Sequence, residues 1–101
     1  MLYFTQLIYI KDGQEDVFNQ FEDVAIPLIA KHHGKLLLRV RPTEQTMVAG
    51  TMERPYEIHL VSFETETDFL NFANDNERKQ FLHLKEQAIR SVLLVKGAEV
   101  G

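Results

Sequence analysis

The order of periodic segments constrains the fold of this chain more than any other feature of its sequence. Segments with strand and helix periodicity follow one another as strand, helix, strand, strand, helix, strand, and they fill all 101 residues. Two helices can cover only one face of a four-stranded sheet. The expected inner strands are nevertheless apolar on both sides, which predicts a partner for the uncovered face.

Composition and charge narrow the class of protein. With 45% apolar and 26% charged residues, residues 1–101 are expected to form a single globular domain. A net charge of −4 argues against nucleic acid, because phosphate binding needs a basic face. The absence of cysteine excludes disulfides, thiolate chemistry and cysteine-based zinc sites. No segment resembles a membrane span or a signal peptide, so we expect a cytoplasmic protein without a membrane partner.

The first strand and helix have clear boundaries in the sequence. Leu2–Ile10 is rich in β-branched and aromatic residues and largely apolar on both faces, as in a central strand. Asp12 followed by Glu15 is typical of a helix N-cap with its reciprocal acid. The helix is expected to run to about His33, with Gly34 as its left-handed C-terminal cap.

The middle of the chain predicts a hairpin. Lys35–Arg41 is expected to be an edge strand, because charged residues and the following Pro42 protect an exposed sheet edge. Thr46–Ala49 is predicted to resume that strand beyond the proline. The third strand is expected over Tyr56–Phe63.

The second half of the chain predicts an interrupted helix and a last strand. Thr65 with Asp68 is typical of a cap that opens a short helix, and Asp75 is expected to cap a second piece over 77–87. The final strand is predicted over Ile89–Lys96, with apolar residues on both faces.

Right-handed crossovers place both helices on one sheet face and give the strand order 4-1-3-2. The opposite face then carries large apolar side chains, which predicts a two-fold homodimer packed sheet against sheet. The alternative is that residues 42–55 fold over this face.

These features resemble the dimeric α+β barrel superfamily, a branch of the ferredoxin-like folds, and most closely its small stand-alone members of unknown function. The matching positions span nearly the whole chain and are Tyr3, Pro27–Leu37, Ala49-Gly50, Val61–Glu64 and Val95–Gly97. The sequence departs from the usual pattern at His33-Gly34, where a Gly-Gly pair is expected, and at Ala49-Gly50, where a Glu-Gly is expected. The superfamily includes cofactor-free monooxygenases, haem-handling enzymes, small isomerases and ligand-sensing domains, so the resemblance implies a fold and not one activity.

His59 and Glu57 are the candidate catalytic residues. They lie two apart on the predicted third strand and therefore share a face, within reach of one small ligand. An imidazole beside a carboxylate is oriented and kept basic, as a general base requires. The structural alternative pairs Glu57 with Arg39 or Arg41 and leaves His59 with a backbone or tyrosine partner.

Four further residues are candidate ligand contacts. Arg39 and Arg41 share a face of the edge strand and can grip a carboxylate or phosphate, although edge protection explains them as well. Tyr3 and Tyr9 share a face of the first strand and can offer hydroxyls to a pocket, or serve as core or interface aromatics.

The sequence therefore predicts a ferredoxin-like α+β domain with a four-stranded antiparallel sheet, assembled as a dimeric barrel. Its expected function is that of a cofactor-independent enzyme, monooxygenase-like or isomerase-like, acting on a small apolar or aromatic metabolite. No cofactor and no metal site are predicted. Two alternatives stay open: a non-catalytic dimer that binds or senses a small ligand, and a purely structural dimer. Whether the protein is an enzyme is not decided by its sequence.

Overall fold

The computed structural model describes residues 1–101 as one layer of strands and one layer of helices. Its elements are β1 (Leu2–Ile10), α1 (Glu15–Lys31), β2 (Gly34–Val40), the 3₁₀ helix η1 (Glu44–Thr46), β3 (Glu57–Phe63), α2 (Glu66–Ala73), α3 (Asn76–Gln80), α4 (Leu82–Ala88) and β4 (Ile89–Gly97). The predicted element order is thus confirmed, with the second helix divided into three short pieces.

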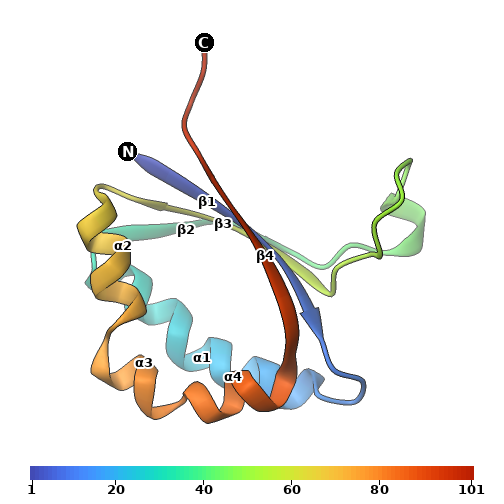
Figure 1. The fold of residues 1–101 in the computed structure, drawn as a ribbon, viewed down its shortest axis with the longest axis horizontal. Coiled ribbons are helices and arrows are strands. Elements are labelled where there is room, and N and C mark those ends of the chain that lie inside the picture. Colours follow the sequence, from blue (N-terminus) through green and yellow to red (C-terminus); the bar gives the residue numbers. More distant parts are fainter.

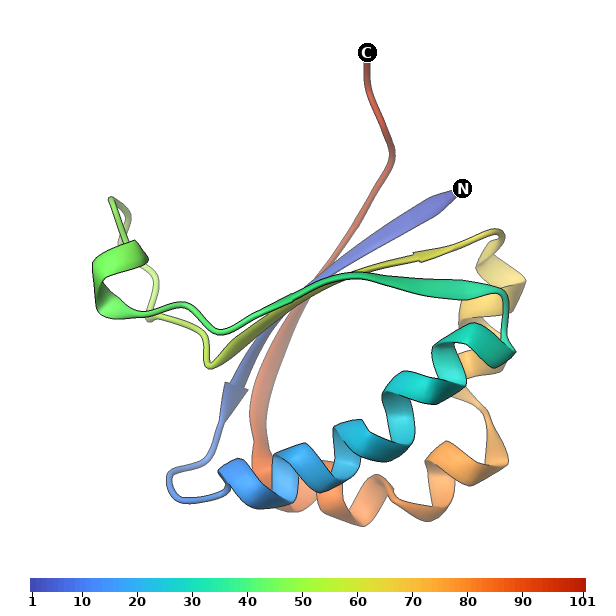
Figure 2. The same ribbon diagram turned by 180° about the vertical axis from the view of Figure 1, so that it is seen from behind.

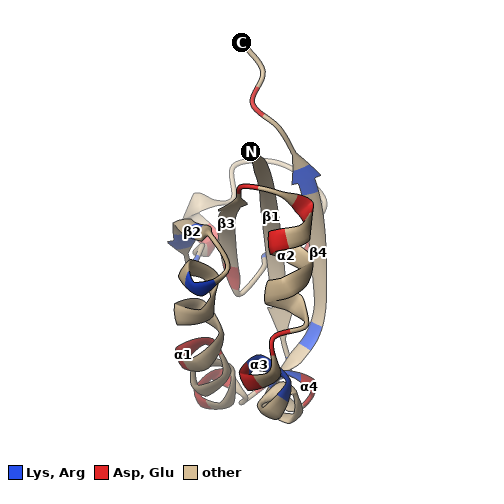
Figure 3. Ribbon diagram, turned by 90° about the vertical axis from the view of Figure 1, so that its left-hand side faces the viewer, with Lys and Arg blue, Asp and Glu red and all other residues tan.

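The four strands form one antiparallel sheet in the order β2-β3-β1-β4. This is the predicted order read from the other edge, and it makes β1 and β3 central, as Figure 3 shows. β1 carries no charged residue, in keeping with its place inside the sheet. The chain therefore has the ferredoxin-like fold that its sequence predicted.

All the α-helices lie against one face of the sheet, and the other face has no helix over it (Figures 1 and 2). The core between the two layers is largely aromatic: the rings of Phe4 and Phe69 stack with centroids 4.1 Å apart, and Phe63 lies edge-on to both. A second cluster packs Phe18 of α1 against Ile8 and Ala88. None of the helices combines the length and the hydropathy that a membrane span requires.

Two of the three predicted helix starts are confirmed. The Thr65 hydroxyl accepts the Asp68 N–H at 3.1 Å, and Asp75 accepts the N–H groups of Glu77 and Arg78. The expected cap at Asp12 is wrong, because α1 begins only at Glu15 and is preceded by Gln14 without a side-chain cap. Gly13, with φ of 77°, lies in a turn between Asp12 and the helix, so the N-cap position falls on Gln14 and not on Asp12.

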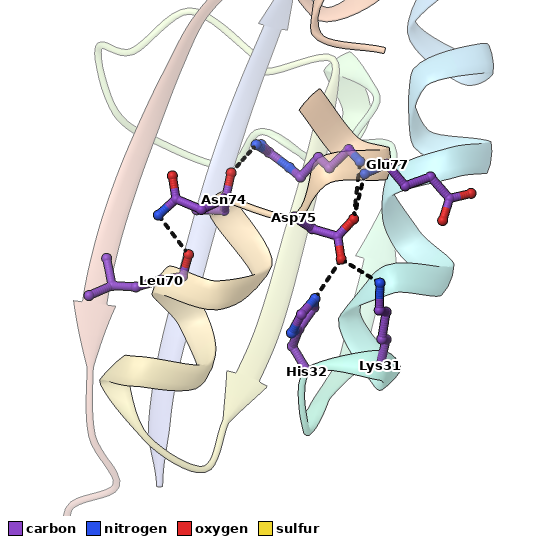
Figure 4. Close-up of polar contacts among 8 residues, drawn as sticks. Lys31, His32, Leu70, Asn74, Asp75 and Glu77 are labelled. Carbon is purple, nitrogen blue, oxygen red and sulfur yellow. Dashed lines mark hydrogen bonds and ion pairs between the residues drawn. The ribbon is translucent and has the colours of Figure 1, made fainter. Parts of the chain in front are cut away.

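Asp75 also ties α3 to the end of α1 (Figure 4). Its Oδ2 accepts hydrogen bonds from Lys31 Nζ at 2.8 Å and His32 Nε2 at 2.7 Å. These two bonds hold the pKa of the Asp75 carboxyl well below its usual range. His32 therefore belongs to a structural contact between helices.

The prediction that Gly34 is the left-handed cap is wrong. The left-handed residue is His33, with φ of 62°, and Gly34 is already the first residue of β2. A side chain at position 34 has no room, because a Cβ there would lie 2.6 Å from Cε1 of Phe63 and 2.7 Å from Cγ2 of Ile29. The glycine lets the strand approach the core closely.

The segment from Pro42 to Pro55 differs from both sequence expectations. Thr46–Ala49 does not resume β2, because Thr43 and Thr46 exchange hydrogen bonds that close the 3₁₀ turn η1. The segment projects past the end of the sheet instead of folding over it (Figure 1), and Val48 is 94% exposed. The open sheet face therefore stays uncovered by the rest of the chain.

We expect Gly34→Ala to lower the free energy of unfolding by about 1–3 kcal/mol, because the added methyl overpacks the contact with Phe63 and Ile29. Urea denaturation measures the change. Gly97→Ala is the matched control, since a Cβ at that strand position meets no atom within 4 Å. Equal stability of the two variants would contradict the close-approach role of Gly34.

Candidate functional site

A cavity of about 330 Å³ lies between the sheet and the helices. Thirteen of its eighteen lining residues are hydrophobic, among them Phe4 and Ile8 of β1, Val61 and Phe63 of β3, and Phe69 and Phe72 of α2. The polar lining residues are Gln6, Glu22, His59, Arg78 and Lys85. An apolar cavity with a few converging polar groups is the usual form of a small-molecule site.

His59 reaches this cavity from the middle of β3 and is bonded to Glu57. The two residues share a face of the strand, as predicted, and His59 Nε2 lies 2.8 Å from Oε1 of Glu57. A carboxylate only accepts hydrogen bonds, so Nε2 carries the hydrogen. In the neutral ring Nδ1 is then the basic atom, which is the arrangement of a histidine that accepts a proton.

Glu57 is fully buried and is held by three side chains. Arg39 donates from Nε to Oε1 and from Nη2 to Oε2, and Arg41 Nε donates to Oε2 at 3.1 Å. Burial acts to raise the pKa of Glu57, but the bonds from His59, Arg39 and Arg41 outweigh it and lower the pKa to about 2. The carboxylate therefore stays ionised, and it lies behind His59 instead of lining the cavity.

The two arginines, which the sequence offered as ligand contacts, lie outside this cavity and bind Glu57. Both point to Glu57, and Arg41 Nη2 also donates to Oδ1 of Asn19 at 2.8 Å. Neither arginine lines the cavity that His59 reaches. Glu57 pairs with the arginines, as the structural alternative expected, and also with His59, which is bonded to this carboxylate and not to a backbone or tyrosine group.

Tyr3 and Tyr9 lie on the opposite face of β1 from the cavity-lining Phe4 and Ile8. The Tyr3 hydroxyl donates to Oε1 of Glu99, and the Tyr9 hydroxyl donates to the Glu53 carbonyl at 2.8 Å. Tyr9 also borders a second, more polar hollow of about 320 Å³ at the end of the sheet. The structure therefore does not bring the two tyrosines together with His59.

Three charged residues of the cavity were missed from the sequence: Glu22 of α1, Arg78 of α3 and Lys85 of α4. Glu22 is only 7% exposed. Burial raises the pKa of its carboxyl, although His59, Arg39 and Arg78 act to lower it. The helical spacing of Glu22 from Phe18 and Ala25 was the available signal, since it places the acid inside the apolar stripe.

No family model matches the sequence, and no curated protein sequence resembles it. Solved structures do match. A protein of unknown function from Rhodopseudomonas palustris superposes with a TM-score of 0.85 at 10% identity, over 99% of this chain and 82% of the other. A Nitrosomonas europaea protein assigned as an antibiotic biosynthesis monooxygenase gives 0.76 at 6% identity, over 100% of both chains.

A third match is a dimeric protein of unknown function and ferredoxin-like fold from Bacteroides fragilis, with a TM-score of 0.67 at 16% identity over 95% of this chain and 93% of the other. At such low identities the three likenesses establish the fold alone. They agree with the ferredoxin-like architecture and with the dimeric α+β barrel resemblance at the level of fold.

Replacing Glu57 by glutamine is expected to cost about 3 kcal/mol of stability at neutral pH, because it leaves two arginines without their shared counter-charge. The carboxyl has a lowered pKa in the folded state, so its contribution is complete above about pH 4.5 and is lost as the pH falls towards 2. Urea unfolding of both proteins from pH 7 to pH 2 should show the difference shrinking over that interval.

In the control Glu53→Gln, an exposed pair with Arg90 is lost and the cost should stay below about 1 kcal/mol. A pH-independent difference for Glu57→Gln would contradict the network.

Proposed function

We propose that the protein is a small enzyme without a tightly bound cofactor that moves a proton at His59 on a small apolar or aromatic metabolite. The observation that carries this proposal is the position of His59. Its ring lines a mainly apolar cavity of about 330 Å³ while Nε2 is bonded to a buried carboxylate. A cavity of this size favours a ligand-handling protein over a purely structural dimer.

The chemistry follows from the division of roles between Glu57 and His59. Because its pKa is about 2, Glu57 remains a carboxylate and fixes the imidazole tautomer without itself exchanging a proton. His59 is then the group that accepts a proton from a ligand in the cavity. Glu57 is a positioning residue, and Arg39 and Arg41 keep it ionised.

Proton abstraction at carbon is the step with which both expected reaction types begin. An isomerase returns the proton to another atom, whereas a cofactor-free oxygenase lets the carbanion react with dioxygen. The name of the Nitrosomonas europaea protein makes oxygenation a reaction to assay here. The alternative function is that of a non-catalytic dimer that binds or senses a ligand, and turnover separates the two. The expected cytoplasmic location is part of the same proposal.

We also propose that two copies of the chain pack through their open sheet faces. Leu38, Val40, Leu93 and Val95 are 38–49% exposed, and the strand pairing places them on the face opposite the helices. Large apolar patches of this kind are unusual on a monomer. The Bacteroides fragilis protein with the same fold is described as dimeric, which supports a second copy as the partner.

Hydrogen–deuterium exchange at carbon tests the role of His59 before the substrate is known. A panel of small aryl ketones and β-keto acids is incubated with the protein in D₂O and followed by mass spectrometry. We expect exchange in at least one member, reduced about 10²–10⁴-fold in His59→Gln because the general base is lost. His83→Gln is the matched control, since His83 is exposed and lies outside the cavity. Exchange by His59→Gln at the unaltered rate would refute the assignment.

Sedimentation equilibrium tests the assembly. The protein is expected to sediment as a dimer at micromolar concentration, and Leu93→Glu is expected to shift it to monomer because a charge is placed in the apolar interface. Val48→Glu, at an exposed position on the projecting segment, should leave the mass unchanged. A stable monomer of the unaltered protein would rule out the dimer.

A further inference from the structure

The cavity contains three charged side chains that the protein itself leaves without an ionic partner. Glu22, Arg78 and Lys85 all line it, but none of the seven ion pairs in the structure involves any of them. Partly buried charges are normally paired, because their removal from water is otherwise uncompensated. The unpaired charges of this cavity therefore require a separate explanation.

Arg78 is the clearest example of a charge in this cavity without an ionic partner. Its guanidinium lies over the rings of Phe21 and Phe72, 5.7 and 5.2 Å from their centroids, and Nη1 donates to the Ala73 carbonyl at 3.1 Å. Its Nε is buried and has no hydrogen-bond partner. Stacking on the two rings holds the guanidinium flat and in place, but it leaves this donor unsatisfied.

Lys85 adds a second positive charge on the same helical wall. Burial lowers the pKa of Lys85 and the nearby charge of Arg78 lowers it further, while Glu22 and Glu86 act in the opposite direction. Glu22 is the only acid that lines the cavity, and burial raises the pKa of that carboxyl. The two cations repel one another, and Glu22 attracts both, so the lining carries one more positive than negative charge.

We propose that Arg78 and Lys85 form an anion subsite, and that the cavity takes a small aromatic or apolar carboxylic acid. A carboxylate matches the planar guanidinium of Arg78 and neutralises the excess of positive charge in the lining. The apolar lining contacts the rest of the ligand. This inference rests on the proposed function in one respect, since it places the ligand in the same cavity.

The subsite also orients the ligand relative to His59. Arg78 and Lys85 come from α3 and α4, whereas His59 comes from β3 on the sheet side of the cavity. A ligand whose carboxylate is held at the helices therefore presents its apolar part to the sheet and to the imidazole. Binding energy from the acid group would position the carbon from which His59 takes a proton.

Isothermal titration calorimetry with 2-naphthoate and 2-naphthamide tests the subsite, because the two probes differ chiefly in charge. The full chain should bind the acid about ten- to a hundredfold more tightly than the amide, as a charge-assisted pair predicts. The preference should fall in Arg78→Met and in Lys85→Met, while the affinity for the amide stays unchanged. Lys79→Met is the matched control, because Lys79 neighbours Arg78 on α3, is exposed and does not line the cavity.

Several results would overturn the subsite. These are equal affinity for both probes, no saturable binding of either at millimolar concentration, or an undiminished preference in the two variants. If Arg78→Met does not fold, Lys85→Met and Arg78→Gln decide the same question. Equal binding of acid and amide rejects the anion subsite but retains the cavity, whereas the proton-transfer role fails separately through unaltered deuterium exchange in His59→Gln.

Discussion

The carboxylate of Glu57 is removed from water inside the sheet, and the positions of three other side chains follow from its burial. An isolated ionised carboxylate in such a place is costly, so it needs charged or strongly donating neighbours. Arg39 and Arg41 supply the charge from the edge strand and its continuation, and His59 supplies a donor from the next position on the same face. One buried charge thus links the sheet edge to the cavity.

A shift in strand pairing makes this network possible. Leu36 pairs with Val61, but the next recorded pair is Leu38 with Leu60, so the register slips by one residue at Leu37. The slip moves Arg39 onto the helix-facing side, opposite His59, and turns Leu38 towards the open face. With regular alternation Arg39 would lie on the open face and Glu57 would lose a partner. The bulge therefore serves the buried carboxylate and the apolar open face together.

The sequence predicted the features of this network that local periodicity determines, but not those that depend on tertiary packing. Strand periodicity was sufficient to place His59 and Glu57 on one face, and cap residues were sufficient to locate the starts of α2 and α3. The bulge at Leu37 has no sequence signal, since neither glycine nor proline marks it. Gly34 was misread because a glycine after a helix indicates a cap, while its actual constraint comes from Phe63, distant in sequence. Residues that meet only through tertiary packing were the ones missed.

The charged lining of the cavity follows from the way the second helical region is broken. Arg78, Phe81, Leu82 and Lys85 follow the spacing of one helix face. In a continuous surface helix, that face would be the buried apolar stripe. Division into α2, α3 and α4 lets this region arch over the sheet, so these long side chains line a cavity instead of entering a filled core. The strand β4 closes the cavity with Val92 and Leu94, while Leu93 and Val95 point to the open face. In the proposed dimer the second copy packs on the same strand that forms one wall of the cavity, so assembly and ligand binding are expected to stabilise each other through β4.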